Sequence, residues 1–213
     1  MPFIVLEYSA RIKDYTSHST GICDRIFRQG YPAVALKRVT VQTTERNRGR
    51  RIDRVLSVSN VKGFIDQREQ FEDRVIASED ISNYKIVWVN DFAYNPARIN
   101  VGSIARLSSF SEGIVSPMYL CFRCSPEIDP VYLECYLETP LFGTEVGKRL
   151  EGSVRMCLSF DGLCGIPVPL PELEVQKRIA KEINTIATKV ALEQRILDYY
   201  MLQKQFLLTG MFI

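Results

Sequence analysis

Alternation between apolar and polar residues marks a series of short strands between residues 31 and 170. Five segments alternate in polarity or are rich in β-branched and aromatic residues, and we expect them to be strands. They are Val39–Thr43, Val55–Val61, Tyr84–Val89, Met118–Arg123 and Arg155–Phe160. Turn-forming pairs such as Lys62-Gly63 and Asn95-Pro96 separate them. This part of the chain therefore reads as a strand-rich domain.

Two helices interrupt the strand pattern. Asp129 is a suitable N-cap, and Pro130 fits the first helical position, so a helix is expected over Pro130–Leu137. A second helical segment is expected over Pro140–Leu150. With the strands, these helices predict an α+β fold: a mixed, strand-rich globular domain followed by one long C-terminal helix.

The long helix follows a proline-rich junction, GIPVPLPELE, at residues 165–174. Its prolines hold the chain extended. Residues 172–213 contain one glycine and no proline. At 1.5 Å per residue, a helix of about 40 residues is about 60 Å long. The chain thus divides into an N-terminal lead at 1–30, a domain at 31–170 and a helix at 171–213.

Apolar residues recur along this helix in alternating steps of four and three, which is the spacing of a heptad seam. The seam consists of Ile179, Ile183, Ile186, Val190, Leu197, Tyr200 and Leu207. Glu193 and Lys204 interrupt it. A helix this long cannot pack on its own domain over its whole length, so the seam predicts pairing with a partner helix. The alternative is a helix packed on its own domain.

Charge concentrates in one region, although the net charge of the chain is only +2. Residues 31–62 hold eight Lys or Arg against Glu45 and Asp53. The stretch TTERNRGRR at 43–51 supplies four arginines, Arg46, Arg48, Arg50 and Arg51, and Arg54 follows. A run of this kind is either a solvated surface loop or a binding site for an anionic partner.

The sequence offers no reaction centre. His18 is the one histidine, and no phosphate-binding glycine loop is present. Cys121 and Cys124 have C-x-x-C spacing but lie in an expected strand, where their side chains point to opposite faces. Residues 94–98, YNPAR, only faintly resemble the adenine-binding motif of methyltransferases. We therefore expect a protein that is not an enzyme and binds no metal or cofactor.

Targeting signals are not recognisable. The first residues carry charge too early for a signal peptide, and no apolar run is long enough to span a membrane. We expect a cytoplasmic protein whose six cysteines are reduced and mostly buried.

Four blocks of sequence resemble one family. Residues 55–71, VLSVSNVKGFIDQREQF, look like the early block of a target recognition domain from the specificity subunit of type I restriction–modification systems. Residues 84–98 with 101–104, residues 112–122, and residues 165–183 are similar to later blocks, in the same order. The resemblance covers about residues 31–213.

The resemblance implies a DNA-reading adaptor. Members of the family carry two recognition domains, each reading half of a split sequence, and two long antiparallel helices set the gap. Methyltransferase subunits dock on this assembly and methylate adenines, and restriction subunits can join. This chain has one recognition domain and one long helix, so it looks like a half-sized subunit that forms a homodimer.

DNA contacts are expected mainly from the arginine-rich loop. Arginine can donate two parallel hydrogen bonds to guanine or neutralise a phosphate, and the side-chain amide of Asn47 is suited to adenine. We expect two base readers among Arg46, Asn47 and Arg48, and phosphate contacts from Arg50, Arg51, Arg54 and Lys62. Tyr94, Asn95 and Arg98 lie in the central family block and either hold the fold or contact the DNA backbone.

Other functions remain open at this point. The chain is alternatively a truncated specificity chain that pairs with another specificity subunit and modulates its assembly without reading DNA. A nuclease or methyltransferase acting alone lacks the necessary motifs, and a repressor lacks a helix-turn-helix signal.

Overall fold

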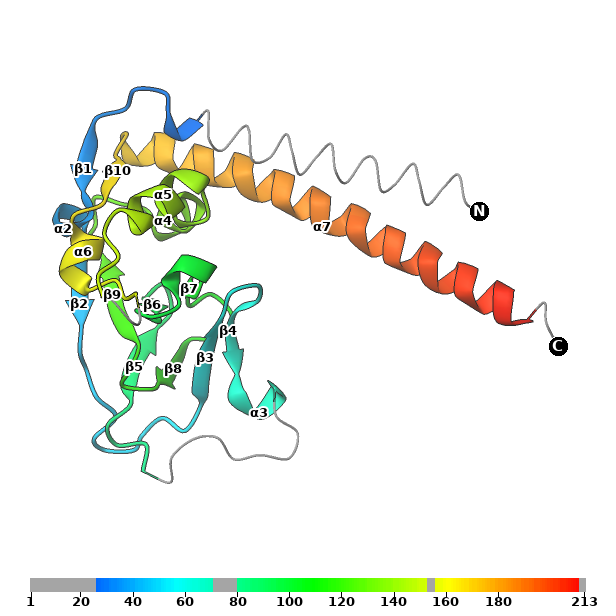
Figure 1. The fold of residues 1–213 in the computed structure, drawn as a ribbon, viewed down its shortest axis with the longest axis horizontal. Helices are drawn as coiled ribbons and strands as arrows, with labels where there is room; N and C mark the ends of the chain where they lie inside the picture. The colour runs from blue at the N-terminus through cyan, green and yellow to red at the C-terminus, as the bar shows by residue number, and fades with distance from the viewer. Residues whose placement is uncertain (1–25, 71–79, 153–155, 211–213) are drawn as a thin grey trace.

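Two four-stranded sheets form the body of the chain, of which the computed structural model describes residues 26–70, 80–152 and 156–210 (Figure 1). Their strand orders are β2-β9-β6-β7 and β4-β3-β8-β5. The strands are β1 Ala33–Ala35, β2 Thr40–Thr43, β3 Val55–Ser59, β4 Gly63–Asp66, β5 Lys85–Trp88, β6 Phe92–Tyr94, β7 Ile104–Arg106, β8 Glu112–Val115, β9 Leu120–Cys124 and β10 Pro167–Pro169. The helices are α2 Leu36–Val39, α3 Gln67–Gln70, the 3-10 turn η1 Ile99–Val101, α4 Pro130–Leu137, α5 Pro140–Gly147, α6 Phe160–Cys164 and α7 Leu173–Gly210.

Strand β6 of the first sheet is buried on both faces, where its successive side chains point in opposite directions. Phe92 and Tyr94 of β6 enter a core shared with α4, α5 and the start of α7. Ala93, between them, enters a second core against Leu56 and Val115 of the other sheet. The molecule is therefore layered as helices, first sheet, second sheet, and the loop that contains the arginines (Figure 1).

Most of the expected elements are confirmed, and with them the α+β fold class. Strands lie within or overlap four of the five predicted segments, and α4 begins and ends where the sequence predicts. Asp129 caps α4 by accepting hydrogen bonds from the backbone N–H groups of Val131 and Tyr132, both at 2.9 Å. The second predicted helix is confirmed as α5, which ends at Gly147 rather than Leu150.

The predicted strand Arg155–Phe160 is wrong within the described residues. Arg155 lies outside them, Cys157 forms only an isolated bridge with Glu151, and Phe160 begins α6. The reason is local: the hydroxyl of Ser159 accepts a hydrogen bond from the N–H of Gly162 at 3.1 Å and so starts a helix. His18 and most of the N-terminal lead also lie outside the described residues.

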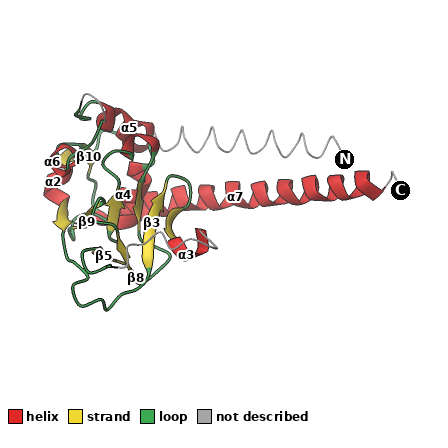
Figure 2. Cartoon of the chain, turned by 60° about the horizontal axis from the view of Figure 1, so that its bottom comes forward, coloured by secondary structure: helices red, strands yellow, loops and turns green. Residues whose placement is uncertain are grey.

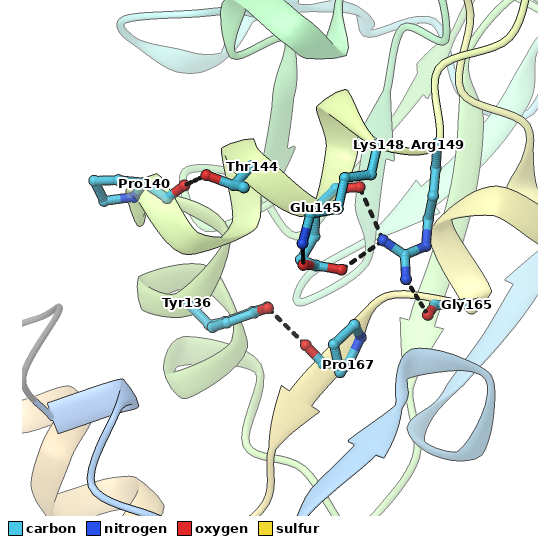
Figure 3. Close-up of polar contacts among 8 residues, drawn as sticks. All are labelled: Tyr136, Pro140, Thr144, Glu145, Lys148, Arg149, Gly165 and Pro167. Atoms are coloured by element: carbon cyan, nitrogen blue, oxygen red, sulfur yellow. Dashed lines mark hydrogen bonds and ion pairs between the residues drawn. The ribbon is translucent and has the colours of Figure 1, made fainter.

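The proline-rich junction forms β10, which pairs antiparallel with β1. The tyrosine hydroxyls of α4 fix this strand, because Tyr132 donates to the carbonyl of Pro169 at 2.8 Å and Tyr136 to that of Pro167 at 2.6 Å. Arg149, next to its ion-pair partner Glu145, donates to the carbonyl of Gly165 at 3.1 Å (Figure 3). These contacts set the path along which the chain enters α7.

Helix α7 begins in the domain core and then projects away from it (Figures 1 and 2). Ile179, Ala180 and Ile183 are at most 6% exposed and belong to the core of their own domain. The alternative, a helix packed on its own domain, is therefore confirmed for the first turns of α7. Ile179 and Ile183, which we expected at a dimer contact, are already buried, so we leave them out of the seam.

Beyond Ile183 the heptad positions are the less exposed positions of α7. Half-buried side chains recur at Ile186, Val190, Glu193, Leu197, Tyr200 and Lys204. Leu207, the last predicted seam residue, is 44% exposed. Glu193 and Lys204, which interrupt the apolar pattern, thus share the face of the seam residues.

Gln176 fixes the root of α7 to the domain. Its side chain is fully buried. Its Oε1 accepts from the N–H of Asp129 at 2.8 Å, and its Nε2 donates to the carbonyls of Glu127 at 3.0 Å and Pro171 at 2.8 Å. One amide therefore ties the helix to the capped end of α4.

Replacing Gln176 with Ala should lower the free energy of unfolding by about 2–4 kcal/mol, because the change leaves buried polar groups without partners. Urea denaturation measures the effect. Gln194, an exposed glutamine further along the same helix, is the control, and Gln194→Ala should change stability by less than about 0.5 kcal/mol. Equal effects of the two changes would contradict the anchoring role of Gln176.

The C-x-x-C pair lies in β9, with its two thiols in different environments. Cys121 lies in the core between the sheets, whereas Cys124 packs against the core beneath the helices. Burial raises the pKa of each thiol to about 12. No group of three or more His, Cys, Asp or Glu side chains suited to a metal ion occurs among the described residues.

We expect Cys121 to resist alkylation in the folded chain. A pKa shift from 9.0 to about 12 lowers the thiolate fraction at pH 8 by about 1000-fold, and burial also blocks access. Mass spectrometry after iodoacetamide treatment should show slow labelling that becomes fast in urea. The half-buried Cys157 is the internal comparison, and labelling of Cys121 as fast as that of Cys157 in the folded chain would contradict the prediction.

Candidate nucleic-acid interface

The arginine-rich loop, residues 44–54, is held in place by backbone pairing and one buried side chain. The N–H of Ile86 donates to the carbonyl of Glu45, and the N–H of Asn47 donates to that of Tyr84, both at 2.9 Å. The start of the loop therefore extends the edge of β5. Ile52, 4% exposed, anchors the other end beneath the second sheet.

Asn47 closes the loop on itself. Its Nδ2 donates to the carbonyl of Ile52 at 2.7 Å, and its Oδ1 accepts from the N–H of Ile52 at 3.3 Å. The residue is 1% exposed. Reading a base would require both bonds to break, so we do not retain Asn47 in the proposed DNA surface. Its buried amide instead shapes the loop that carries the arginines.

The unusual backbone conformation in the loop lies at Arg50 and not at its glycine. Gly49 has no positive φ, and no atom lies within 4 Å of the position where a Cβ would be added. Arg50 carries the unusual conformation instead, with a φ of 49°. A left-handed backbone at a residue other than glycine costs roughly 1–2 kcal/mol, which the clamp by Asn47 helps to offset.

The five loop arginines are exposed, and four of them have a partner among the residues that the structure describes. Arg46 donates to the carbonyl of Asn83 at 2.9 Å, and Arg50 pairs with Asp80 at 3.0 Å. Arg51 pairs with Glu45 at 2.8 Å, and Arg54 lies 3.6 Å from Asp66 and over the ring of Phe110. Exposed pairs of this kind are worth about 0–1 kcal/mol, so a phosphate can replace the carboxylate.

The remaining predicted residues lie at the other end of β3 from the loop. Lys62 is exposed in the turn between β3 and β4. Arg98 is also exposed and lines a polar pocket of about 300 Å³ with Asn60 and Ser103. A five-residue strand spans about 17 Å, so the structure separates this group from the arginine-rich loop.

Tyr94 and Asn95 hold the fold. Tyr94 is fully buried, its hydroxyl donates to the carbonyl of Leu158 at 3.2 Å, and burial raises the pKa of this phenol. Asn95 is 7% exposed, and its Oδ1 accepts from the N–H of Ala97 at 3.0 Å. Of the two roles that the sequence left open for Tyr94 and Asn95, these contacts support holding the fold rather than contacting the DNA backbone.

The sequence analysis did not single out a second set of polar residues beside the loop. The Nε1 of Trp88 donates to Glu45 at 3.2 Å, and Arg123 forms a two-point ion pair with Asp91 at 2.6 and 2.8 Å. The hydrogen bond to Asp91 raises the pKa of Arg123. The outward position of Arg123 in its strand is visible in the sequence, but the residues around it come from two other segments, residue 45 and residues 88–91.

Comparison with known proteins gives no match to a family model or to a curated protein. Solved structures do match. The HsdS subunit from Thermoanaerobacter tengcongensis aligns with 92% of this chain at 16% identity and a TM-score of 0.63. A type I restriction–modification structure, described in terms of complex assembly and conformational transition, aligns with 97% at 14% identity and 0.66. The type I S subunit from M. genitalium aligns with 96% at 12% identity and 0.59.

The alignments cover 49%, 52% and 55% of those chains, so this chain spans about half the length of the structures it matches. No helix among the described residues is long and apolar enough to cross a membrane. The resemblance read from the sequence is thus confirmed at the level of the fold: the chain has the architecture of about half of a type I specificity subunit.

Proposed function

We propose that the chain is a noncatalytic specificity subunit that reads double-stranded DNA and directs a type I adenine methyltransferase to it. The observation that carries the proposal is the arrangement of the arginine-rich loop and α7. The loop lies at the bottom of Figure 1, below the ends of β3 and β5, whereas α7 leaves from the helical layer at the top. DNA and protein partners can therefore bind at the same time.

A second copy of the chain is the proposed partner of α7. The seam of Ile186, Val190, Leu197, Tyr200 and Leu207 would pack against the same seam of the other copy. Two-fold symmetry would then place two identical reading surfaces at a fixed separation. The target would be an inverted repeat with a gap set by the paired helices.

A second apolar row on α7 offers a site for further subunits. Leu192, Ile196, Tyr199 and Phe206 are between 39% and 76% exposed and follow steps of four, three and seven. This spacing keeps them on one face of the helix, beside the seam. We assign this row to the methyltransferase subunits that the fold resemblance implies, with restriction subunits as additional members of the assembly.

Binding of the purified full chain to duplex DNA tests the proposal. Phosphate contacts predict that the logarithm of the affinity falls linearly with the logarithm of salt concentration, by about 0.9 for each phosphate neutralised. Absence of DNA binding, together with association with a full-length specificity subunit, would instead support the assembly-modulator alternative. Adenine methylation by the chain alone with S-adenosylmethionine would contradict its noncatalytic role.

A further inference from the structure

Two neighbours of Arg51 restrict its orientation. Its Nη2 donates to Glu45 at 2.8 Å, and its guanidinium carbon lies 5.4 Å from the centre of the Trp88 ring. The Nε1 of Trp88 donates to the other carboxylate oxygen of Glu45 at 3.2 Å. Glu45 therefore links the aromatic platform to the arginine that lies over it.

Arg123 is supported in a parallel way. Its Nε and Nη2 donate to the two carboxylate oxygens of Asp91, which is 1% exposed. Oδ2 of Asp91 also accepts from the backbone N–H of Trp88 at 3.0 Å. The side chain of Arg123 is nevertheless 52% exposed. A buried carboxylate therefore holds one edge of the guanidinium, while the rest of the group can face solvent.

The two supported arginines share a neighbourhood. The pKa of Arg123 is raised first by its hydrogen bond to Asp91 and further by the charges of Asp91 and Glu45. Glu45 thus lies within electrostatic range of one guanidinium and bonds to the other. Val41 is paired directly with Arg123 across β2 and β9, which places it on the same face, and it is 64% exposed.

Arginines whose orientation is restricted by neighbouring side chains are suited to read bases rather than to contact phosphates. A fork fixed by a carboxylate or an aromatic ring loses little conformational freedom on binding, and two parallel N–H donors match the O6 and N7 atoms of guanine. Arg46, Arg48 and Arg50 have neither a stacking ring nor a buried carboxylate among the described contacts. They are suited to phosphate, whose contacts need charge more than direction, and this role replaces the base reading first expected for Arg46 and Arg48.

We propose that Arg51 and Arg123 read guanines in the major groove, with Glu45, Trp88 and Asp91 as positioning residues. This inference rests on the proposed DNA-reading function and replaces the phosphate role first expected for Arg51. Val41, beside Arg123, offers an apolar contact suited to a thymine methyl group. The half-site read by one copy then contains at least two G·C pairs.

Selection of binding sites from a random duplex library tests the proposal with the full chain. Lysine keeps the charge of arginine but lacks the fork, so Arg51→Lys and Arg123→Lys should each reduce the preference for guanine at one position by about 10- to 100-fold. Affinity for unrelated duplex DNA and its salt dependence should stay within about threefold. Arg178→Lys, an exposed position on α7 outside the proposed DNA surface, is the control and should leave the selected sequence unchanged.

The positioning roles have a separate readout. Glu45→Gln should weaken the guanine preference at the same position as Arg51→Lys, and the double variant should lose little more than either change alone. Thermal melting identifies any variant that fails to fold, and Arg51→Lys, whose partner Glu45 is exposed, then carries the test alone. If Arg51→Lys and Arg123→Lys both select the same sequence as the unaltered chain, the inference is wrong and the proposed function stands. If the unaltered chain selects no sequence, the inference and the proposed function are both wrong.

Discussion

Replacing Arg46, Arg48, Arg50 and Arg51 together with glutamate should weaken binding to duplex DNA by on the order of 100-fold or more. Four attractive charges become repulsive on the surface that faces the phosphates. The salt dependence should also become shallower, by about 0.9 for each phosphate that the variant no longer neutralises. The ion pairs that these arginines make within the domain are exposed, so their removal should change stability little. Fluorescence anisotropy with labelled duplexes at several salt concentrations gives both quantities.

The matched control makes the same change of charge on α7. Lys177, Arg178, Lys181 and Arg195 are exposed on this helix. Their replacement with glutamate alters the net charge by the same amount, away from the loop (Figure 1). It should leave most of the affinity intact. Equal losses in the two variants would show that overall charge drives binding, and an unaffected loop variant would favour the assembly-modulator alternative.

Leu197→Glu should convert the proposed dimer into a monomer and weaken self-association by about 100-fold or more. A glutamate at the centre of the seam would be buried against an apolar partner face without a counter-charge. The monomer carries one reading surface, so affinity for a two-half-site target should fall towards that for a single half-site. Sedimentation velocity measures the change of mass, and binding to one-site and two-site duplexes measures its consequence.

Leu202→Glu is the control for this experiment. Leu202 lies off the seam and is 64% exposed, so the same chemical change there should leave the dimer intact. A monomeric unaltered chain, or equal effects at the two positions, would contradict pairing through the seam.

Local chemistry made part of the fold predictable. The Asp129 cap with Pro130 behind it defines α4, and a high content of β-branched and aromatic residues marks β3 and β5. The run Phe92–Tyr94 was not predicted as a strand because it is short and all three side chains are buried, which removes the alternation. The order of strands in the sheets comes from contacts between distant segments, which local patterns do not encode.

Only part of the proposed DNA-binding site was predictable from the sequence. The position of the arginine-rich loop follows from its charge. The burial of Asn47 does not, because it depends on two hydrogen bonds to Ile52 in the folded loop. The supports of Arg51 and Arg123 depend on bringing together β5, β9 and residue 45, which lie far apart in the sequence.

A map of N6-methyladenine in cells that express this chain with a type I methyltransferase subunit tests whether the chain directs methylation to DNA. A homodimeric specificity subunit should produce a new methylated sequence that is an inverted repeat with a gap of constant length. A new sequence without this symmetry would contradict homodimerisation and indicate pairing with a different specificity chain. No new methylated sequence, with both proteins present and folded, would contradict the claim that this chain directs methylation to DNA.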